Sequence, residues 1–198
     1  MLGSYIIWSE TFNFSGDTWA INTAKSGVYH RVLDRILNQL YAMQSYHNKL
    51  HVIRFDLHVG TYTPDNTMMT TFKRRLFKRL YRRYDFKRIG YVWVREQEKS
   101  KNQHYHWALI LDGSKVNYPH KTLELAKLVW EEMSGSIWVP DNCYYNVKRG
   151  DKEAMGDVVF RLSYFAKARG KGYRPPQTKD YQTSRVKFKE LPVIEECA

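Results

Sequence analysis

The sequence predicts an α+β fold in which helices pack on an antiparallel central sheet. Segments with apolar residues at alternate positions, as in strands, are interspersed with segments whose apolar residues recur every three or four positions, as in helices. Two strand-like segments, 89–98 and 104–111, are separated only by the polar residues KSKNQ, which favours a β-hairpin. This mixture of elements is typical of an antiparallel sheet covered by helices on at least one side.

The first helix and the first strand follow from their apolar residues. A helix is expected within residues 22–48, because apolar residues recur there at helical steps, at Leu33, Ile36, Leu40 and Met43. Residues 50–63 alternate instead, with one face formed by Ile53, Phe55, Leu57 and Val59. The other face carries Arg54, Asp56 and His58, so this segment is predicted to be a half-buried strand that ends at the turn residues TPDN.

The later elements are identified in the same way. Residues 68–84 return to helical spacing through Phe72, Leu76 and Leu80, and the hairpin follows. A helix is then expected at 121–133, a short strand at 136–140, and a last helix at 156–170 with Gly170 as its stop. The predicted order is helix, strand, helix, hairpin, helix, short strand, helix.

The length and composition indicate a single domain. The chain has 198 residues, of which 43% are apolar, enough for one substantial core. We expect the core at about 50–170, an N-terminal extension with a helix at 1–49, and an irregular C-terminal tail at 171–198. Two cysteines exclude a disulfide framework, and neither a signal peptide nor a membrane span is visible, so a cytoplasmic protein is expected, in the host cell if a phage encodes it.

The charge of the chain favours a polyanionic partner. The formal net charge is +12, and nucleic acid is the commonest partner of so basic a protein. The segment FKRRLFKRLYRR has no acidic residue, and the phosphate contacts we expect come from Arg54 on the strand and from Lys73, Arg74, Arg75, Lys78 and Arg82 on the helix. A solvated helix face or a membrane-surface helix is the alternative interpretation of the basic helix.

The segment HYHWALIL contains a candidate metal site. Successive side chains of a strand point to opposite faces, so His104 and His106 share one face. A hairpin brings the end of the preceding strand beside them, with Glu96 as the first choice for a third ligand and Glu98 in reserve. Two imidazoles and a carboxylate suit a divalent metal, whereas the alternative is a solvated strand end with surface histidines.

The segment SYFAK contains a candidate nucleophile. Lys167 follows Tyr164 by three residues, on nearly the same face of the predicted helix. A neighbouring cation can ease the ionisation of a tyrosine, whose phenolate can attack phosphorus. A half-packed tyrosine beside a solvated lysine is the ordinary alternative.

These segments, in this order, resemble the HUH-type rolling-circle replication initiators, which are single-strand endonucleases. The likeness is closest to the small replication proteins of filamentous phages (inoviruses) and related prophages, and it covers roughly residues 50–170. IRFDLHV resembles the first motif of the family, HYHWALIL the metal-binding histidine pair, and SYFAK the nucleophilic tyrosine with its lysine. The bulky Tyr105 between the histidines is tolerated by the pattern.

The resemblance implies a fold, an activity and roles for residues. An HUH endonuclease-like domain would hold Mg²⁺ or Mn²⁺ on His104, His106 and Glu96. Tyr164, assisted by Lys167, would nick single-stranded DNA or an origin hairpin and rejoin it through a 5′-phosphotyrosine, starting the replication of a phage, prophage or plasmid. Ala168 leaves no second tyrosine one turn on, which indicates the single-tyrosine branch. No GxxxxGK[ST] motif is present, so a separate helicase is implied.

Other functions remain open from the sequence. A non-catalytic DNA-binding repressor or an accessory replication protein of the same fold would share the basic charge without the chemistry. A transposase of the HUH type would share the nicking step. Histidine-triad hydrolases are disfavoured because Ala108 stands where their next histidine is required.

Overall fold

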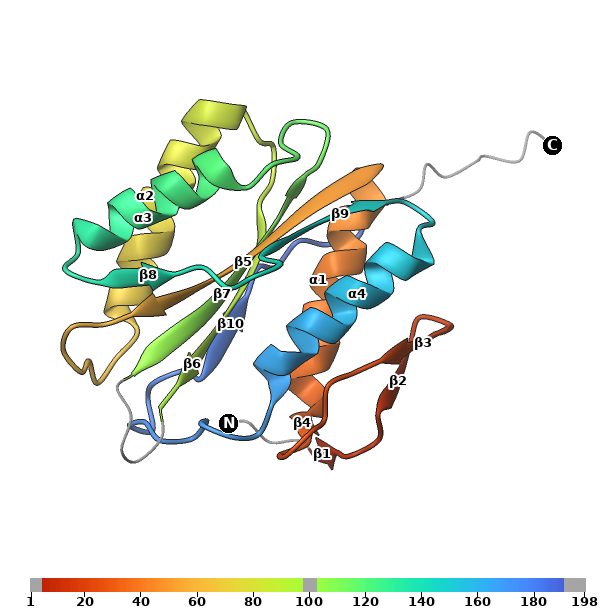
Figure 1. Cartoon of the computed structure of the whole chain (residues 1–198), viewed down its shortest axis with the longest axis horizontal. Coiled ribbons are helices and arrows are strands. Elements are labelled where there is room, and N and C mark those ends of the chain that lie inside the picture. Colours follow the sequence, from red (N-terminus) through yellow and green to blue (C-terminus); the bar gives the residue numbers. More distant parts are fainter. Residues whose placement is uncertain (1–4, 98–102, 191–198) are drawn as a thin grey trace.

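The computed structural model describes residues 5–97 and 103–190, and it confirms the α+β fold. The central sheet has six strands and is flanked on both faces by helices (Figure 1). The helices are α1 (His30–Tyr46), α2 (Thr67–Tyr84), α3 (His120–Glu131) and α4 (Lys152–Ser163), and α4 is followed by the 3₁₀ turn η1 (Tyr164–Ala166). No helix in the described part of the chain is both long and apolar enough to cross a membrane.

The strand order of the sheet is β10-β6-β7-β5-β8, and β9 also pairs with β5. These strands are β5 (Lys49–His58), β6 (Gly90–Glu96), β7 (His104–Asp112), β8 (Ser136–Trp138), β9 (Tyr144–Lys148) and β10 (Tyr181–Thr183). All of the pairings are antiparallel. The predicted hairpin of β6 and β7 is therefore confirmed, although Glu98 falls in the loop at 98–102, outside the described residues.

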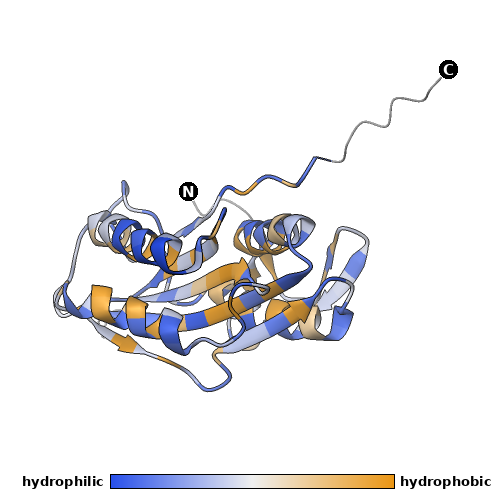
Figure 2. Ribbon diagram, turned by 90° about the horizontal axis from the view of Figure 1, so that it is seen from above, coloured by the Kyte–Doolittle hydropathy of each residue, from blue (hydrophilic) through white to orange (hydrophobic). Residues whose placement is uncertain are grey.

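Two separate cores lie on the two faces of the sheet. On one face, α2 and α3 pack over Phe55 and Trp107. On the other face, α1 and α4 pack over Val52, Val94 and Ala108. The central strands accordingly carry long hydrophobic stretches, whereas the helices alternate hydrophobic and hydrophilic residues along their length (Figure 2).

The prediction that residues 50–63 form a half-buried strand is wrong. In β5 every residue from Leu50 to Leu57 is buried, including Arg54 and Asp56. The polar face of this strand is covered because α1 and α4 lie over it, and polar side chains placed there must find partners inside the protein.

Three regions contain strands that the sequence did not predict. Strand β9 was not predicted, and β10 orders part of the tail that was expected to be irregular. The N-terminal extension contains two small antiparallel pairs, β1 (Ile6–Ile7) with β4 (Val28–Tyr29) and β2 (Thr11–Phe14) with β3 (Asp17–Ala20).

The last helix also has other bounds than predicted. It begins earlier, because the side chain of Asp151 accepts a hydrogen bond from the Ala154 amide and caps the helix. It ends at Ser163 rather than at Gly170, and the following turn places Tyr164 at the end of the helix instead of within it.

Candidate active site

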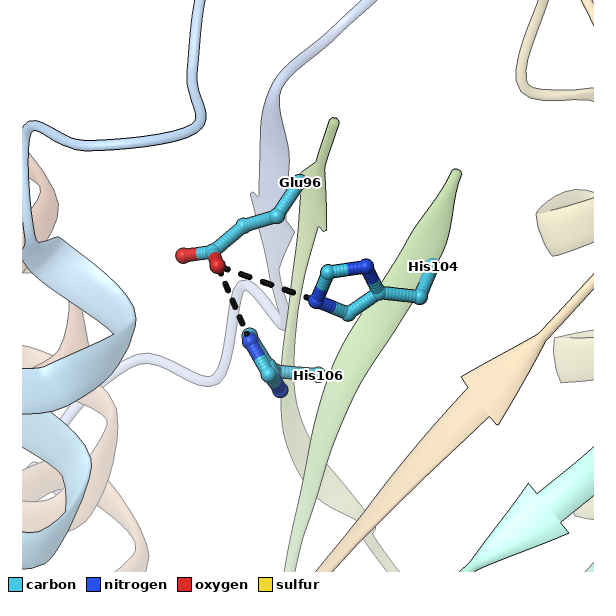
Figure 3. A group of neighbouring side chains, drawn as sticks. All are labelled: Glu96, His104 and His106. Atoms are coloured by element: carbon cyan, nitrogen blue, oxygen red, sulfur yellow. Dashed lines mark hydrogen bonds and ion pairs between the residues drawn. The ribbon is translucent and has the colours of Figure 1, made fainter. Parts of the chain in front are cut away.

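Three side chains that can ligate a metal meet where β6 and β7 approach the hairpin loop. One ligand atom from each of Glu96, His104 and His106 lies within 4.8 Å of the others. Oε2 of Glu96 is 3.1 Å from Nε2 of His106 and 3.8 Å from Nε2 of His104 (Figure 3). The register pairs Glu96 with His104, and the two-residue spacing places His106 on the same face. Together these groups can hold a metal ion.

The alternative interpretation, surface histidines at a solvated strand end, does not fit this geometry. The side chain of His106 is 4% exposed and that of Glu96 is 12% exposed. Two imidazole nitrogens and one carboxylate oxygen form a donor set that suits a divalent metal such as Mn²⁺ and leaves coordination positions for a substrate. The donor set thus fits a catalytic divalent cation.

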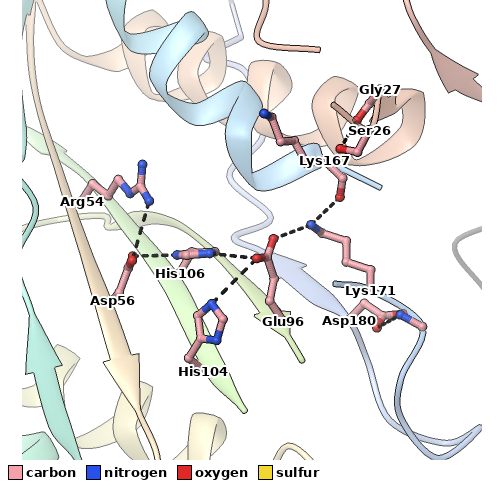
Figure 4. A network of polar contacts seen from close by, with 11 residues as sticks. Ser26, Gly27, Arg54, Asp56, Glu96, His104, His106, Lys167, Lys171 and Asp180 are labelled. Carbon is pink, nitrogen blue, oxygen red and sulfur yellow. Dashed lines mark hydrogen bonds and ion pairs between the residues drawn. The ribbon is translucent and has the colours of Figure 1, made fainter. Parts of the chain in front are cut away.

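Asp56, which the sequence did not single out as a site residue, orients His106. Its Oδ1 lies 2.8 Å from Nδ1 of His106, and the register places the two residues opposite each other on β5 and β7 (Figure 4). With Nδ1 held by the carboxylate, Nε2 is the nitrogen directed at Glu96. Carboxylate–histidine pairs of this kind fix the tautomer of metal-ligating histidines. The indication in the sequence that Asp56 could belong to the site was its position on the same face of the predicted strand as Arg54.

Lys171 neutralises the other side of Glu96. Its ammonium group is fully buried and donates to Oε1 of Glu96 at 2.8 Å and to the carbonyl of Lys167 (Figure 4). The two carboxylate oxygens therefore have different roles, with Oε1 facing the lysine and Oε2 facing the histidines. Sequence periodicity gave no indication of this contact, because Lys171 lies in a loop 75 positions away.

These contacts set the protonation of the cluster. Burial by itself would raise the pKa of Glu96, but the hydrogen bond to His106 and the charge of Lys171 lower this pKa to about 2. Burial by itself would lower the pKa of His106, but the close carboxylates of Asp56 and Glu96 raise this pKa instead. His106 must lose a proton to offer Nε2 to a cation, because a ligating imidazole is neutral.

Tyr164 lies directly beside this cluster. Its ring centroid is 5.3 Å from that of His106. The guanidinium carbon of Arg54 lies 5.0 Å from the same tyrosine ring, and Nζ of Lys167 lies 5.3 Å from it. Residues from β5, β7 and the end of α4 thus gather on one face of the sheet.

The pKa of Tyr164 is raised rather than lowered, against the expectation from its neighbour Lys167. Burial, followed by the charge of Glu96, raises the pKa of Tyr164, and Arg54 is the main group that lowers it. Lys167 follows the end of η1, where the backbone becomes extended (ψ 139°), so the two residues do not share a continuous helix. Its ammonium group donates instead to the carbonyl of Ala24 at 2.9 Å.

A pocket of about 460 Å³ opens next to Tyr164. Its lining has two basic residues, Arg54 and Arg161, and one acidic residue, Asp157. Tyr144 and Phe160 give it exposed aromatic surface. Arg54 is only 7% exposed, and its Nε has no hydrogen-bond partner among the described residues. Its Nη2 lies 3.7 Å from Oδ2 of Asp56, so one side of the guanidinium is paired, and the buried Nε is the donor left for an anionic ligand at this position.

The basic residues of α2 lie away from the cluster. Phe72 of this helix packs with Phe55 and Trp107 on the face of the sheet opposite to His106. Lys73 donates to the hydroxyl of Tyr91 on β6 at 3.1 Å. Of the predicted nucleic-acid-binding residues, only Arg54 is brought to the candidate site.

Replacing Asp56 with asparagine is expected to weaken Mn²⁺ binding. Loss of such an outer partner typically lowers metal affinity by about 10- to 100-fold, because the ligating imidazole becomes less basic and less well oriented. Isothermal titration with Mn²⁺ measures the effect. Asp112→Asn is the matched control, since Asp112 forms a similar pair with His47 at 3.3 Å at the other end of β7. Parental affinity in Asp56→Asn would exclude the orienting role.

Comparison with known proteins identifies the family. The family model described as the YagK/YfjJ C-terminal domain matches residues 13–184, a range that contains the cluster, Asp56 and Tyr164. No curated protein and no solved structure matched the chain. Since the match covers well over half of the sequence, this protein belongs to the prophage-associated YagK/YfjJ C-terminal domain family.

Proposed function

We propose that this protein is a metal-dependent single-strand DNA endonuclease and strand transferase with Tyr164 as its nucleophile. The observation that carries the proposal is the placement of Tyr164 beside the group formed by Glu96, His104 and His106. A tyrosine next to a divalent-metal site is the arrangement expected for phosphoryl transfer through a covalent intermediate. The role in rolling-circle replication and the likeness to HUH initiators stay predictions from the sequence.

In the proposed reaction the hydroxyl oxygen of Tyr164 attacks the phosphorus of a DNA phosphodiester. The bond from phosphorus to the 3′ oxygen breaks, which leaves a 5′-phosphotyrosine and a free 3′-hydroxyl. The phenol loses one proton and the leaving 3′ oxygen gains one, so the step needs no further reactant. Attack by a 3′-hydroxyl on the phosphotyrosine reverses the step and joins strands.

The side chains around Tyr164 support this chemistry. A divalent cation held by Glu96, His104 and His106 would polarise a phosphate oxygen and offset the charge of Glu96. Arg54, with its unused Nε, can donate to a phosphate in the adjoining pocket. Lys167 lies near the same ring and adds positive charge where the phosphate would sit.

One observation favours a second candidate, a non-catalytic DNA-binding protein of the same fold. His106 is flanked by Asp56 and Glu96, and Glu96 is also paired with Lys171. The positive and negative charges of such a network balance one another. Buried charges that are paired in this way also occur as purely structural features. The two candidates differ in whether the protein binds Mn²⁺ and cleaves DNA.

A search for the covalent intermediate tests the proposal. The protein is incubated with labelled single-stranded oligonucleotides of random sequence and Mn²⁺ or Mg²⁺, and denaturing gels followed by peptide mapping detect an adduct. We expect a metal-dependent adduct on Tyr164, and sequencing the attached DNA would define the recognised site. Absence of cleavage with either metal would reject the enzyme in favour of the DNA-binding candidate.

A further inference from the structure

A groove of about 850 Å³ runs between the first half of α1 and the chain segment 174–188. Its shape depends on Gln39 of α1, whose Oε1 accepts hydrogen bonds from the Ser184 hydroxyl at 2.6 Å and from the Val186 amide at 3.0 Å. These bonds hold the segment that follows β10 against the helix. The groove is therefore a formed feature of the fold.

The groove is strongly basic. Its lining contains one acidic residue, Asp180, and six basic residues, Arg31, Arg35, Arg174, Lys179, Arg185 and Lys187. Asp180 is neutralised by Arg174, with Oδ2 and Nε 2.6 Å apart. The side chains of Arg35, Arg185 and Lys187 are exposed and form no hydrogen bond or ion pair with any residue that the structure describes. Positive charge gathered in a groove in this way attracts a polyanion.

The same groove carries an exposed aromatic ring. Phe188 is 50% exposed and Tyr181 is half-buried, and both line the groove. Basic grooves with accessible aromatic rings are characteristic of proteins that bind single-stranded nucleic acid, because unpaired bases can stack on the rings while phosphates follow the cations. A duplex, whose bases are already stacked, would leave Phe188 unused.

Two connections in the structure link the groove to the candidate active site. Strand β10, which lines the groove, pairs with β6, the strand that ends in Glu96. The loop that starts with Lys171, the partner of Glu96, leads to Arg174 and Asp180 in the groove wall. Helix α1, which forms the other wall, covers the face of the sheet to which His106 belongs, whereas α2 covers the opposite face.

We propose that the groove between α1 and residues 174–188 is the binding track for single-stranded nucleic acid. The proposal replaces α2 as the main phosphate-binding surface. It rests on the proposed function in one respect, that the strand is DNA, and it does not require cleavage.

Binding of a labelled dT20 oligonucleotide in EDTA tests the track, measured by fluorescence anisotropy over a series of salt concentrations. The groove variant is Arg35→Gln, Arg185→Gln and Lys187→Gln combined, and the rival variant is Arg74→Gln, Arg75→Gln and Arg82→Gln combined. A control variant with the same loss of charge combines Lys49→Gln, Lys127→Gln and Lys148→Gln, which are exposed elsewhere on the fold. Thermal unfolding verifies that all three variants are folded.

The groove variant is expected to reduce the slope of log K against log salt by about 2, since each lost single-strand phosphate contact removes roughly 0.7. The rival and control variants should reduce it by clearly less. Phe188→Ala should weaken dT20 binding by about tenfold, in the range known for the loss of one stacked base, and leave duplex binding unchanged.

Several results would overturn the track. These are a failure of the parent protein to bind dT20, an equal or larger loss of slope in the rival variant, or an equal loss for single-stranded and duplex DNA in Phe188→Ala. Because the assay contains no metal, a failure of the cleavage test leaves its result unaffected.

Discussion

Replacing Tyr164 with phenylalanine is expected to abolish the covalent protein–DNA adduct while the protein still folds and binds DNA. Phenylalanine keeps the ring that packs against His106 and Arg54, and it removes only the attacking oxygen. Because transfer through Tyr164 depends on that oxygen, we expect no detectable adduct. Denaturing gels with a single-stranded oligonucleotide and Mn²⁺ measure the adduct, and anisotropy measures binding.

Tyr173→Phe is the matched control for Tyr164→Phe. Tyr173 is exposed and does not line the groove, so this variant should form the adduct at the parental level. Tyr181, which lies on β10 and lines the groove, is the other tyrosine to which an adduct could map. An adduct that persists in Tyr164→Phe and maps to either of these tyrosines would show that the nucleophile is assigned wrongly. Burial and Glu96 raise the pKa of Tyr164, so its phenol is protonated at neutral pH and must lose its proton during the attack.

Replacing both His104 and His106 with alanine is expected to abolish metal-dependent cleavage and to leave most of the DNA affinity intact. The two imidazoles supply two of the three donors of the cluster, and a single carboxylate holds Mn²⁺ weakly. The expected result is loss of detectable cleavage together with loss of Mn²⁺ binding in a calorimetric titration. Full nicking activity in the double variant would show that the cluster is not the catalytic metal site.

Two further variants make the histidine result interpretable. Removal of His106 leaves Asp56 and Glu96 without their shared partner, which can destabilise the fold. Glu96→Gln keeps the size of the side chain and an oxygen that can accept from Lys171, and it should also lose Mn²⁺ binding and cleavage. His120→Ala, at an exposed position at the start of α3, should behave as the parent protein. Parental Mn²⁺ affinity in Glu96→Gln would remove Glu96 from the ligand set.

Much of the fold could be predicted from the local spacing of apolar residues. The spacing of apolar residues was sufficient to predict the helices that became α1, α2 and α3, because each helix buries one regular face. The hairpin of β6 and β7 could be predicted because two apolar segments flank a short polar one. The same two-residue period determined that His104 and His106 share a face, and the antiparallel hairpin brought Glu96 opposite His104. The arrangement of the candidate metal group could therefore be predicted from the short segment that holds the hairpin.

Contacts between distant segments were decided only by the tertiary structure. Asp56 and Lys171 reach the cluster from β5 and from a loop near the C-terminus, and nothing in their neighbourhood in the sequence indicates the partner they meet. Strands β9 and β10 are short, and they are stabilised by pairing with β5 and β6 rather than by a strong pattern of their own. Sequence spacing reports that an element has a buried face, but not what covers it.

The positions of the charged residues were likewise predicted from the sequence only in part. The sequence by itself determined that the chain is basic, with a net charge of +12, and that one helix concentrates cations. Only the packing decided that this helix covers the face of the sheet opposite to His106, and that cations scattered between positions 31 and 187 line one groove. The packing also determined that burial and Glu96 raise the pKa of Tyr164, whereas the neighbouring Lys167 had led us to expect a lowered pKa. The physical reason is that burial and electrostatic interactions depend on distances in space, and these distances are fixed only when the layers of the fold pack together.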